Sequence, residues 1–259
     1  MKQQLIYKLL MVLLTALLLA GCQSNSNRQL LDDKKLKRAD IHYQIGLDAL
    51  YKNQLPKAFD ELMKSEAIDP NRPEVLDALG YAWRLRGNLE KSESYYLRAL
   101  RSGAGSSTYN NYGSLLLESK RYAEAKVQLE KALDDPRYRK QFIAYINLGD
   151  ALMGLGQFDH AIDAYRQAGA FNPRQTLSRV KEADAYVSQK RYNYAQALYE
   201  TLLRENSLNR SALEGFVKLL TLRNDKANAR KYLIAFIEKT TSRLDRAWAS
   251  DELEKLRQP

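Results

Sequence analysis

The sequence has little of what a classical enzyme or a disulfide-stabilised domain needs. Among 259 residues there is one cysteine, and the two histidines, His42 and His160, lie far apart. A single cysteine excludes an intramolecular disulfide framework and a zinc site built from cysteines. The chain also lacks a Gly-rich phosphate loop and the HExxH and GxSxG patterns. We therefore expect a protein that is not an enzyme, with no catalytic residue, no metal and no cofactor.

Glycine and proline are also scarce, at 12 and 6 residues, which excludes a collagen-like or low-complexity chain. Hydrophobic residues make up 45% of the chain, enough for a real core. The net charge is +10, but acids and bases alternate along the predicted helices, as in the segment KRYAEAKVQLEK at 120–131. That pattern is typical of a solvated helix face with ion pairs. We expect neither a nucleic-acid partner nor a small-molecule substrate.

The N-terminal segment has the pattern of a signal peptide. Residues 1–21 carry two lysines and no acid, and Leu9–Ala20 is apolar except for Thr15. A run of about 12 residues is shorter than the roughly 20 that span a membrane. The segment ends in Leu-Ala-Gly followed by Cys22, which resembles a bacterial lipobox. The resemblance implies cleavage before Cys22 by the lipoprotein signal peptidase and acylation of its thiol, for example by palmitate. A chance cysteine after an ordinary signal peptide is the alternative.

The residue after Cys22 is Gln23. In lipoproteins of this type an aspartate at that position retains the protein in the inner membrane, so the resemblance implies the periplasmic face of the outer membrane. Residues 22–38 are predicted to be the lipidated cysteine and a flexible tether. The basic side chains of the tether could contact anionic headgroups, but we favour a solvated spacer.

From residue 39 the sequence repeats. One series of small residues is followed, twelve positions later in each case, by a second series. The first series is Gly46, Gly80, Gly113, Gly149, Ala183 and Gly215, and the second is Ala58, Ser92, Ala125, Ala161, Ala195 and Ala227. The spacings of 34, 33, 36, 34 and 32 residues are those of the tetratricopeptide repeat (TPR). The small residues let the two helices of a repeat approach closely, and stacked repeats bury each other's faces.

The sequence thus predicts an all-α fold, a TPR superhelix of about six helix-turn-helix repeats with a C-terminal capping helix. The predicted repeats cover 39–241, and the cap covers 242–259. The individual repeats are placed at 39–72, 73–106, 106–139, 142–175, 176–207 and 208–241. Their helix pairs are predicted at 39–52/55–67, 73–86/89–101, 107–119/122–133, 139–154/158–170, 174–188/192–204 and 208–222/225–238. Repeat six is expected to pack irregularly, because Glu182, Glu214 and Lys218 occupy positions that are usually apolar or small.

Protein recognition is the function that remains. In a TPR array the first helices of the repeats line a concave groove. The residues predicted to line it, with an apolar end in repeat one and a polar middle, are Tyr43, Leu47, Leu50, Tyr81, Arg84, Asn110, Asn111, Ser114, Asn147 and Asp150. For the asparagines two roles stay open: hydrogen bonding to a bound peptide, or hydrogen bonding to a neighbouring part of the chain.

A closer resemblance lies in the segment Tyr109–Ala125, with NNYG at 110–113 and RYAEA at 121–125, followed by ALDDPRY at 132–138. It resembles the third repeat of the PilF/PilW family, the outer-membrane pilotin lipoproteins of type IV pili. The resemblance covers about 10–257 and fades in repeats five and six. It implies a scaffold for localisation and multimerisation of the type IV pilus secretin, with an apolar groove of Tyr43, Leu47, Leu50 and Leu62 contacting a secretin subunit. Alternatives are a TPR lipoprotein of another assembly system, such as an Flp-type pilus, and a periplasmic protease adaptor.

Overall fold

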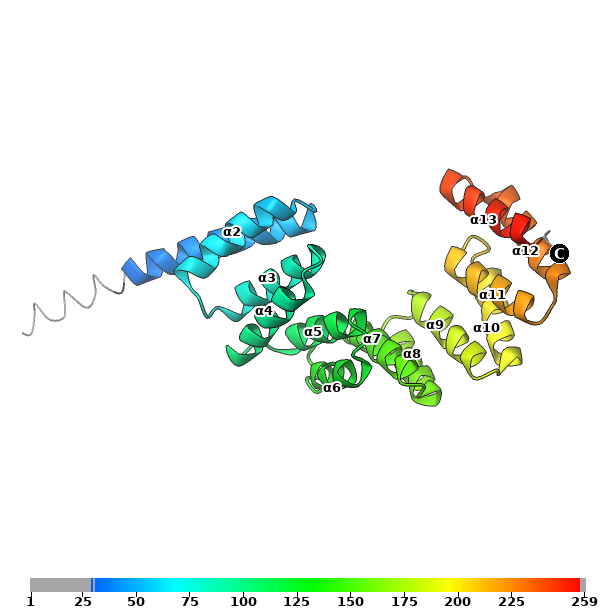
Figure 1. The fold of residues 1–259 in the computed structure, drawn as a ribbon, viewed down its shortest axis with the longest axis horizontal. Helices are drawn as coiled ribbons and strands as arrows, with labels where there is room; N and C mark the ends of the chain where they lie inside the picture. Colours follow the sequence, from blue (N-terminus) through cyan, green and yellow to red (C-terminus); the bar gives the residue numbers. More distant parts are fainter. Residues whose placement is uncertain (1–28, 30, 257–259) are drawn as a thin grey trace, which may run out of the picture. The chain divides into compact units, whose positions relative to one another are not determined.

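The computed structural model describes residues 29 and 31–256 (Figure 1). In this part of the chain the elements are α-helices joined by short turns, and no strand occurs among them. The chain divides into two compact units, Met1–Ala104 and Gly105–Pro259. The predicted signal peptide at 1–21 and the predicted lipidation site Cys22 lie outside the described residues.

The first unit contains repeats one and two. Its first helix covers 31–51, and it is followed by α2 (Leu55–Ile68), α3 (Pro73–Leu85) and α4 (Leu89–Arg101). Because the helix begins by residue 31, the prediction of a flexible tether as far as residue 38 is wrong for 31–38. That segment is rich in Leu, Lys and Arg, which are good helix formers, and it extends a helix already held against α2.

The second unit contains the remaining repeats and the capping helix. Repeats three and four consist of α5 (Ser106–Glu118), α6 (Tyr122–Leu133), α7 (Gln141–Gly154) and α8 (Phe158–Phe171). Repeats five and six consist of α9 (Leu177–Ser188), α10 (Tyr192–Glu205), α11 (Arg210–Leu222) and α12 (Lys226–Lys239). The capping helix is α13 (Arg243–Lys255), and its N-cap residue is Ser242, whose side chain accepts a hydrogen bond from the Asp245 backbone N–H. None of the described helices combines the length and the apolar character that crossing a membrane requires.

Close helix contacts explain the first series of small residues. A Cβ atom placed on Gly46, Gly80 or Gly113 would lie 2.6–2.7 Å from the nearest atom of one large side chain of the next helix. That side chain occupies the same place in each repeat, as Leu62, Tyr96 or Leu129, and is fully buried. The helix pairs of repeats one to three therefore fit only around a residue without a side chain, and the TPR prediction is confirmed.

Repeat six corrects one part of the predicted register. Ala227 is exposed, whereas Val217 and Ala229 are buried and lie twelve positions apart, as the paired small residues of the other repeats do. Leu233, which takes the place of Leu62 in this repeat, is fully buried as well. The step from Ala183 to Val217 thus matches the regular period of the array. The assignment of Gly215 as the repeat residue is wrong, because Gly215 is small for another reason: a Cβ there would lie 2.5 Å from the Tyr199 hydroxyl oxygen.

The turns inside the repeats give the same register. A residue with positive φ follows the first helix of every repeat, at Asn53, Gly87, Lys120, Gly156, Lys190 and Asn224. The step between the last two is again one regular period. The expected irregular packing of repeat six is therefore wrong, since Phe216, Leu219 and Leu220 of α11 are buried in the core of the second unit. The charged residues at the unusual positions form ion pairs instead: Lys218 with Glu214 at 2.8 Å, and Arg166 with Glu182 at 2.8 Å.

Candidate protein-binding groove

The side-chain amides of Asn110 in repeat three and Asn147 in repeat four form a hydrogen bond between α5 and α7. The Asn147 side chain on α7 donates hydrogen bonds to Oδ1 of Asn110 and to Oγ of Ser114 on α5, both at 3.0 Å. Asn110 is buried, with 6% of its surface exposed, and Asn111 lies half-buried on the same helix. Of the two roles left open for these asparagines, the structure assigns Asn110 and Asn147 to contacts within the chain, joining the first helices of neighbouring repeats.

Asp150 belongs to a second polar contact, between α7, α8 and α9. Its carboxylate accepts a hydrogen bond from the Tyr165 hydroxyl at 2.7 Å and pairs with Lys181 Nζ at 2.7 and 3.0 Å. Burial raises the pKa of Tyr165, and the negative charge of Asp150 raises it further. Tyr165 therefore remains a neutral donor that holds Asp150 in place.

The same arrangement recurs one repeat later. The Tyr199 hydroxyl on α10 donates to Oδ1 of Asp184 on α9. Burial raises the pKa of Asp184, while the Tyr199 hydrogen bond and the positive charges of Lys181 and Lys218 act in the opposite direction. The sequence prediction missed Lys181 and Asp184. The signal that could have found them is that Asp150 and Asp184 lie one repeat period apart, each beside the small repeat residue.

These groups line a groove of about 580 Å³ in the second unit. Its lining is Leu117, Glu118, Tyr122, Asp150, Met153, Gly154, Tyr165, Lys181 and Asp184. Apolar side chains lie beside fixed charges, and Asp150 and Asp184 already have hydrogen-bonding partners. Such a surface can bind a polypeptide through hydrogen bonds and apolar contacts.

The apolar residues predicted for the groove of repeat one are half-buried rather than open. Tyr43, Leu47 and Leu50 pack against the core of the first unit. The Arg72 guanidinium lies 4.9 Å from the centre of the Tyr43 ring. Leu62 is completely buried beneath Gly46, so its assignment to the groove is wrong. The prediction for Leu62 fails because this position of the second helix packs its side chain against the glycine of the first helix.

In repeat two, Tyr81 and Arg84 are both half-exposed on α3. The Arg84 guanidinium lies 5.6 Å from the centre of the Tyr81 ring, which is within the range of a cation–π contact. An aromatic ring held by a cation in this way presents both an apolar face and a positive charge at the surface of the first unit.

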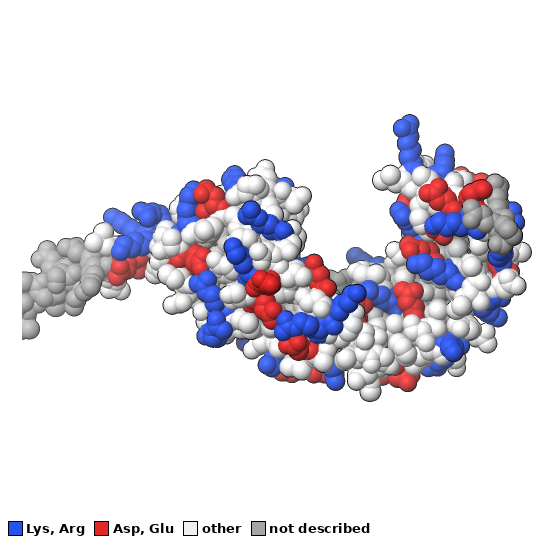
Figure 2. Space-filling view, in the orientation of Figure 1, with Lys and Arg blue, Asp and Glu red and all other residues white. Residues whose placement is uncertain are grey.

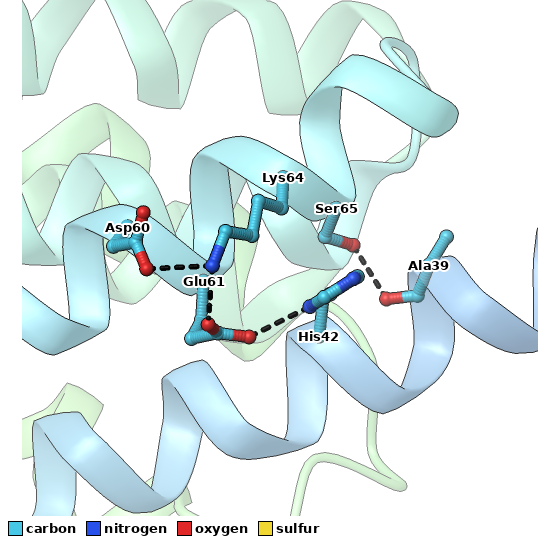
Figure 3. A network of polar contacts seen from close by, with 6 residues as sticks. All are labelled: Ala39, His42, Asp60, Glu61, Lys64 and Ser65. Atoms are coloured by element: carbon cyan, nitrogen blue, oxygen red, sulfur yellow. Dashed lines mark hydrogen bonds and ion pairs between the residues drawn. The ribbon is translucent and has the colours of Figure 1, made fainter.

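His42 belongs to a polar network that ties the first helix to α2 (Figure 3). Its Nδ1 lies 2.6 Å from Oε2 of Glu61, and Lys64 Nζ lies 2.8 Å from the other carboxylate oxygen. Hydrogen bonds from Lys64 and His42 lower the pKa of Glu61 to about 2. Ser65, fully buried, donates to the Ala39 carbonyl at 2.7 Å. The described residues contain no group of three or more His, Cys, Asp or Glu side chains that could hold a metal ion.

Known proteins resemble the chain in both sequence and fold. Tetratricopeptide-repeat family models match residues 106–134, 142–175 and 180–241. The type IV pilus assembly protein PilF of Pseudomonas aeruginosa is 25% identical over 225 residues, covering 86% of this chain and 89% of PilF.

Two solved structures have the same fold. The structure of Pseudomonas aeruginosa PilF has a TM-score of 0.68 at 23% identity, and covers 85% of this chain and 99% of that one. That of PilW, a type IV pilus biogenesis factor, has a TM-score of 0.73 at 19% identity, and covers 85% of this chain and 98% of that one. The chain is thus an all-α tetratricopeptide-repeat protein that is similar in sequence and fold to type IV pilus biogenesis proteins.

Proposed function

We propose that this chain is a TPR lipoprotein of type IV pilus biogenesis that acts as a pilotin. In this proposal, lipids on Cys22 hold it on the periplasmic face of the outer membrane. There it binds a subunit of the pilus secretin and supports the localisation and multimerisation of that ring.

The observation that carries the proposal is the extent of the relationship with PilF. It covers 86% of this chain and 89% of the relative, so the two proteins share the whole array rather than one generic repeat. The only cysteine of the chain ends a short apolar leader, which is where a lipid anchor would be attached.

The first unit offers the surface for the secretin contact. Tyr43, Leu47 and Leu50 follow each other at helical spacing, and each is half-buried, so part of an apolar stripe remains accessible. A partly exposed apolar stripe favours binding of an apolar segment of a partner protein.

The test is secretin assembly in cells that lack the gene and are complemented with variants. Leu47→Asp should abolish heat-resistant secretin multimers and pili. Met63→Asp is the matched control, because Met63 has 52% of its surface exposed in the same unit. Since Leu47 also packs on the core, circular dichroism must establish that the Leu47→Asp protein is folded at growth temperature.

Two outcomes would contradict the proposal. If a folded Leu47→Asp protein still assembles secretin multimers, the stripe is not the binding site. If deletion of the whole gene leaves secretin multimers and pili intact, the pilotin role is wrong.

Anchoring is tested separately. Cys22→Ala should give a chain that no longer incorporates labelled palmitate and leaves the outer-membrane fraction. A mutant chain that remains firmly in that fraction would refute anchoring through Cys22.

A further inference from the structure

The first helix extends beyond the helix that supports it. Its contacts with α2 begin at Ala39, which accepts from Ser65, and at His42, which contacts Glu61. Because α2 ends at Ile68, the turns before Ala39 have no helix beside them on this side, and every residue of 31–38 is exposed.

Three of the four basic residues in these exposed turns share one face, and Lys37 lies outside it. Leu31, Lys34, Lys35 and Arg38 are spaced at i, i+3, i+4 and i+7, which places them along one side of a helix. The acids of the segment, Asp32 and Asp33, fall elsewhere on the helix circumference. In Figure 2 the basic and acidic side chains at this end of the helix gather on opposite edges.

The basic side chains of this face make no ion pairs within the described part of the chain. Lys34, Lys35 and Arg38 form no ion pair with another described residue, in contrast to Arg72, which pairs with Asp40 at 2.8 Å. Leu31 and Ile41 beside them are 60% and 56% exposed. A second copy of the chain would bring like charges together, so self-association through this face is disfavoured.

We propose that the face formed by Leu31, Lys34, Lys35 and Arg38 binds anionic phospholipid headgroups. The inference rests on the proposed anchor at Cys22, nine residues before Leu31. Nine residues reach at most roughly 30 Å when fully extended, so an anchored chain keeps this face close to the bilayer surface. Cations beside a lipid anchor bind an anionic membrane surface more tightly than either signal alone.

The experiment uses residues 22–259 with Cys22→Ser, which retains every residue that the structure describes but has no lipid. Binding is measured by co-sedimentation with phosphatidylethanolamine vesicles containing about 30% phosphatidylglycerol. Neutral vesicles contain phosphatidylcholine in place of phosphatidylglycerol. We expect binding to the anionic vesicles, loss of that binding at high salt, and little binding to the neutral ones.

The decisive variant is the triple change Lys34→Gln, Lys35→Gln and Arg38→Gln, which keeps good helix formers. Each basic residue near a membrane contributes about 1 kcal/mol, or about fivefold in affinity, so the triple change should weaken binding roughly 100-fold. The control removes the same charge at three exposed positions elsewhere: Lys57→Gln, Arg101→Gln and Lys231→Gln. It should bind as the unchanged chain does.

Equal binding of the two triple variants, or equal binding to neutral and anionic vesicles, would overturn the inference. Either result would leave the proposed anchoring and pilotin role intact, because fractionation of Cys22→Ala cells and secretin multimers report on those independently.

Discussion

Gly149→Ala tests the close contact between the two helices of repeat four. A Cβ atom on Gly149 would overlap the ring of Tyr165, with three ring atoms closer than 3.0 Å. That ring has 3% of its surface exposed, and its hydroxyl is held by Asp150, so the ring cannot move aside without breaking the hydrogen bond.

The magnitude follows from two opposing effects. Replacing glycine by alanine inside a helix ordinarily stabilises it by about 0.5–1 kcal/mol. Overpacking of a tight core costs about 1–3 kcal/mol. We therefore expect Gly149→Ala to lower the free energy of unfolding by about 1–2 kcal/mol, measured by urea titration with far-UV circular dichroism.

Gly169→Ala on α8 is the matched control. The nearest atom to its Cβ position is Ser178 Oγ at 3.3 Å, a hydroxyl that can rotate. This variant should be neutral or more stable by up to about 1 kcal/mol. If Gly149→Ala is as stable as Gly169→Ala, the argument from the close helix contact is refuted.

Three further predictions concern polar contacts. Tyr199→Phe removes the donor to the Asp184 carboxylate and should cost about 1–3 kcal/mol in urea unfolding; an unchanged midpoint would contradict this. The pKa of Glu61, about 2, is below its unfolded value, so its stabilisation is present above about pH 4.5 and lost as the pH falls towards 2. Glu61→Gln should therefore flatten the acid limb of the stability curve, and a parallel curve would oppose the assignment. Asn147→Ala deprives the buried Asn110 of a donor and should cost about 1–3 kcal/mol, whereas a purely peptide-binding role predicts no loss.

The sequence alone determined the class of fold and the position of most helices. In most repeats the close approach of the two helices leaves room only for glycine or alanine, so these residues recur at the period of the repeat. Gly46, Gly80 and Gly113 are among them, and each lies against one large buried side chain. In repeat six Val217 takes this place, so the nearby Gly215 is misleading in the sequence.

The roles of the predicted groove residues were decided only by the tertiary structure. A side chain on the first helix of a repeat can face either a partner or the neighbouring repeat, and its residue type does not distinguish the two. Asn110 and Asn147 fit both roles in sequence, and only the distance between α5 and α7 makes them partners of each other. Leu62 was likewise predicted to contact a partner, but in the folded chain it packs against Gly46 and is fully buried. Local spacing determines which residues share a helix face, whereas packing between helices determines what that face contacts.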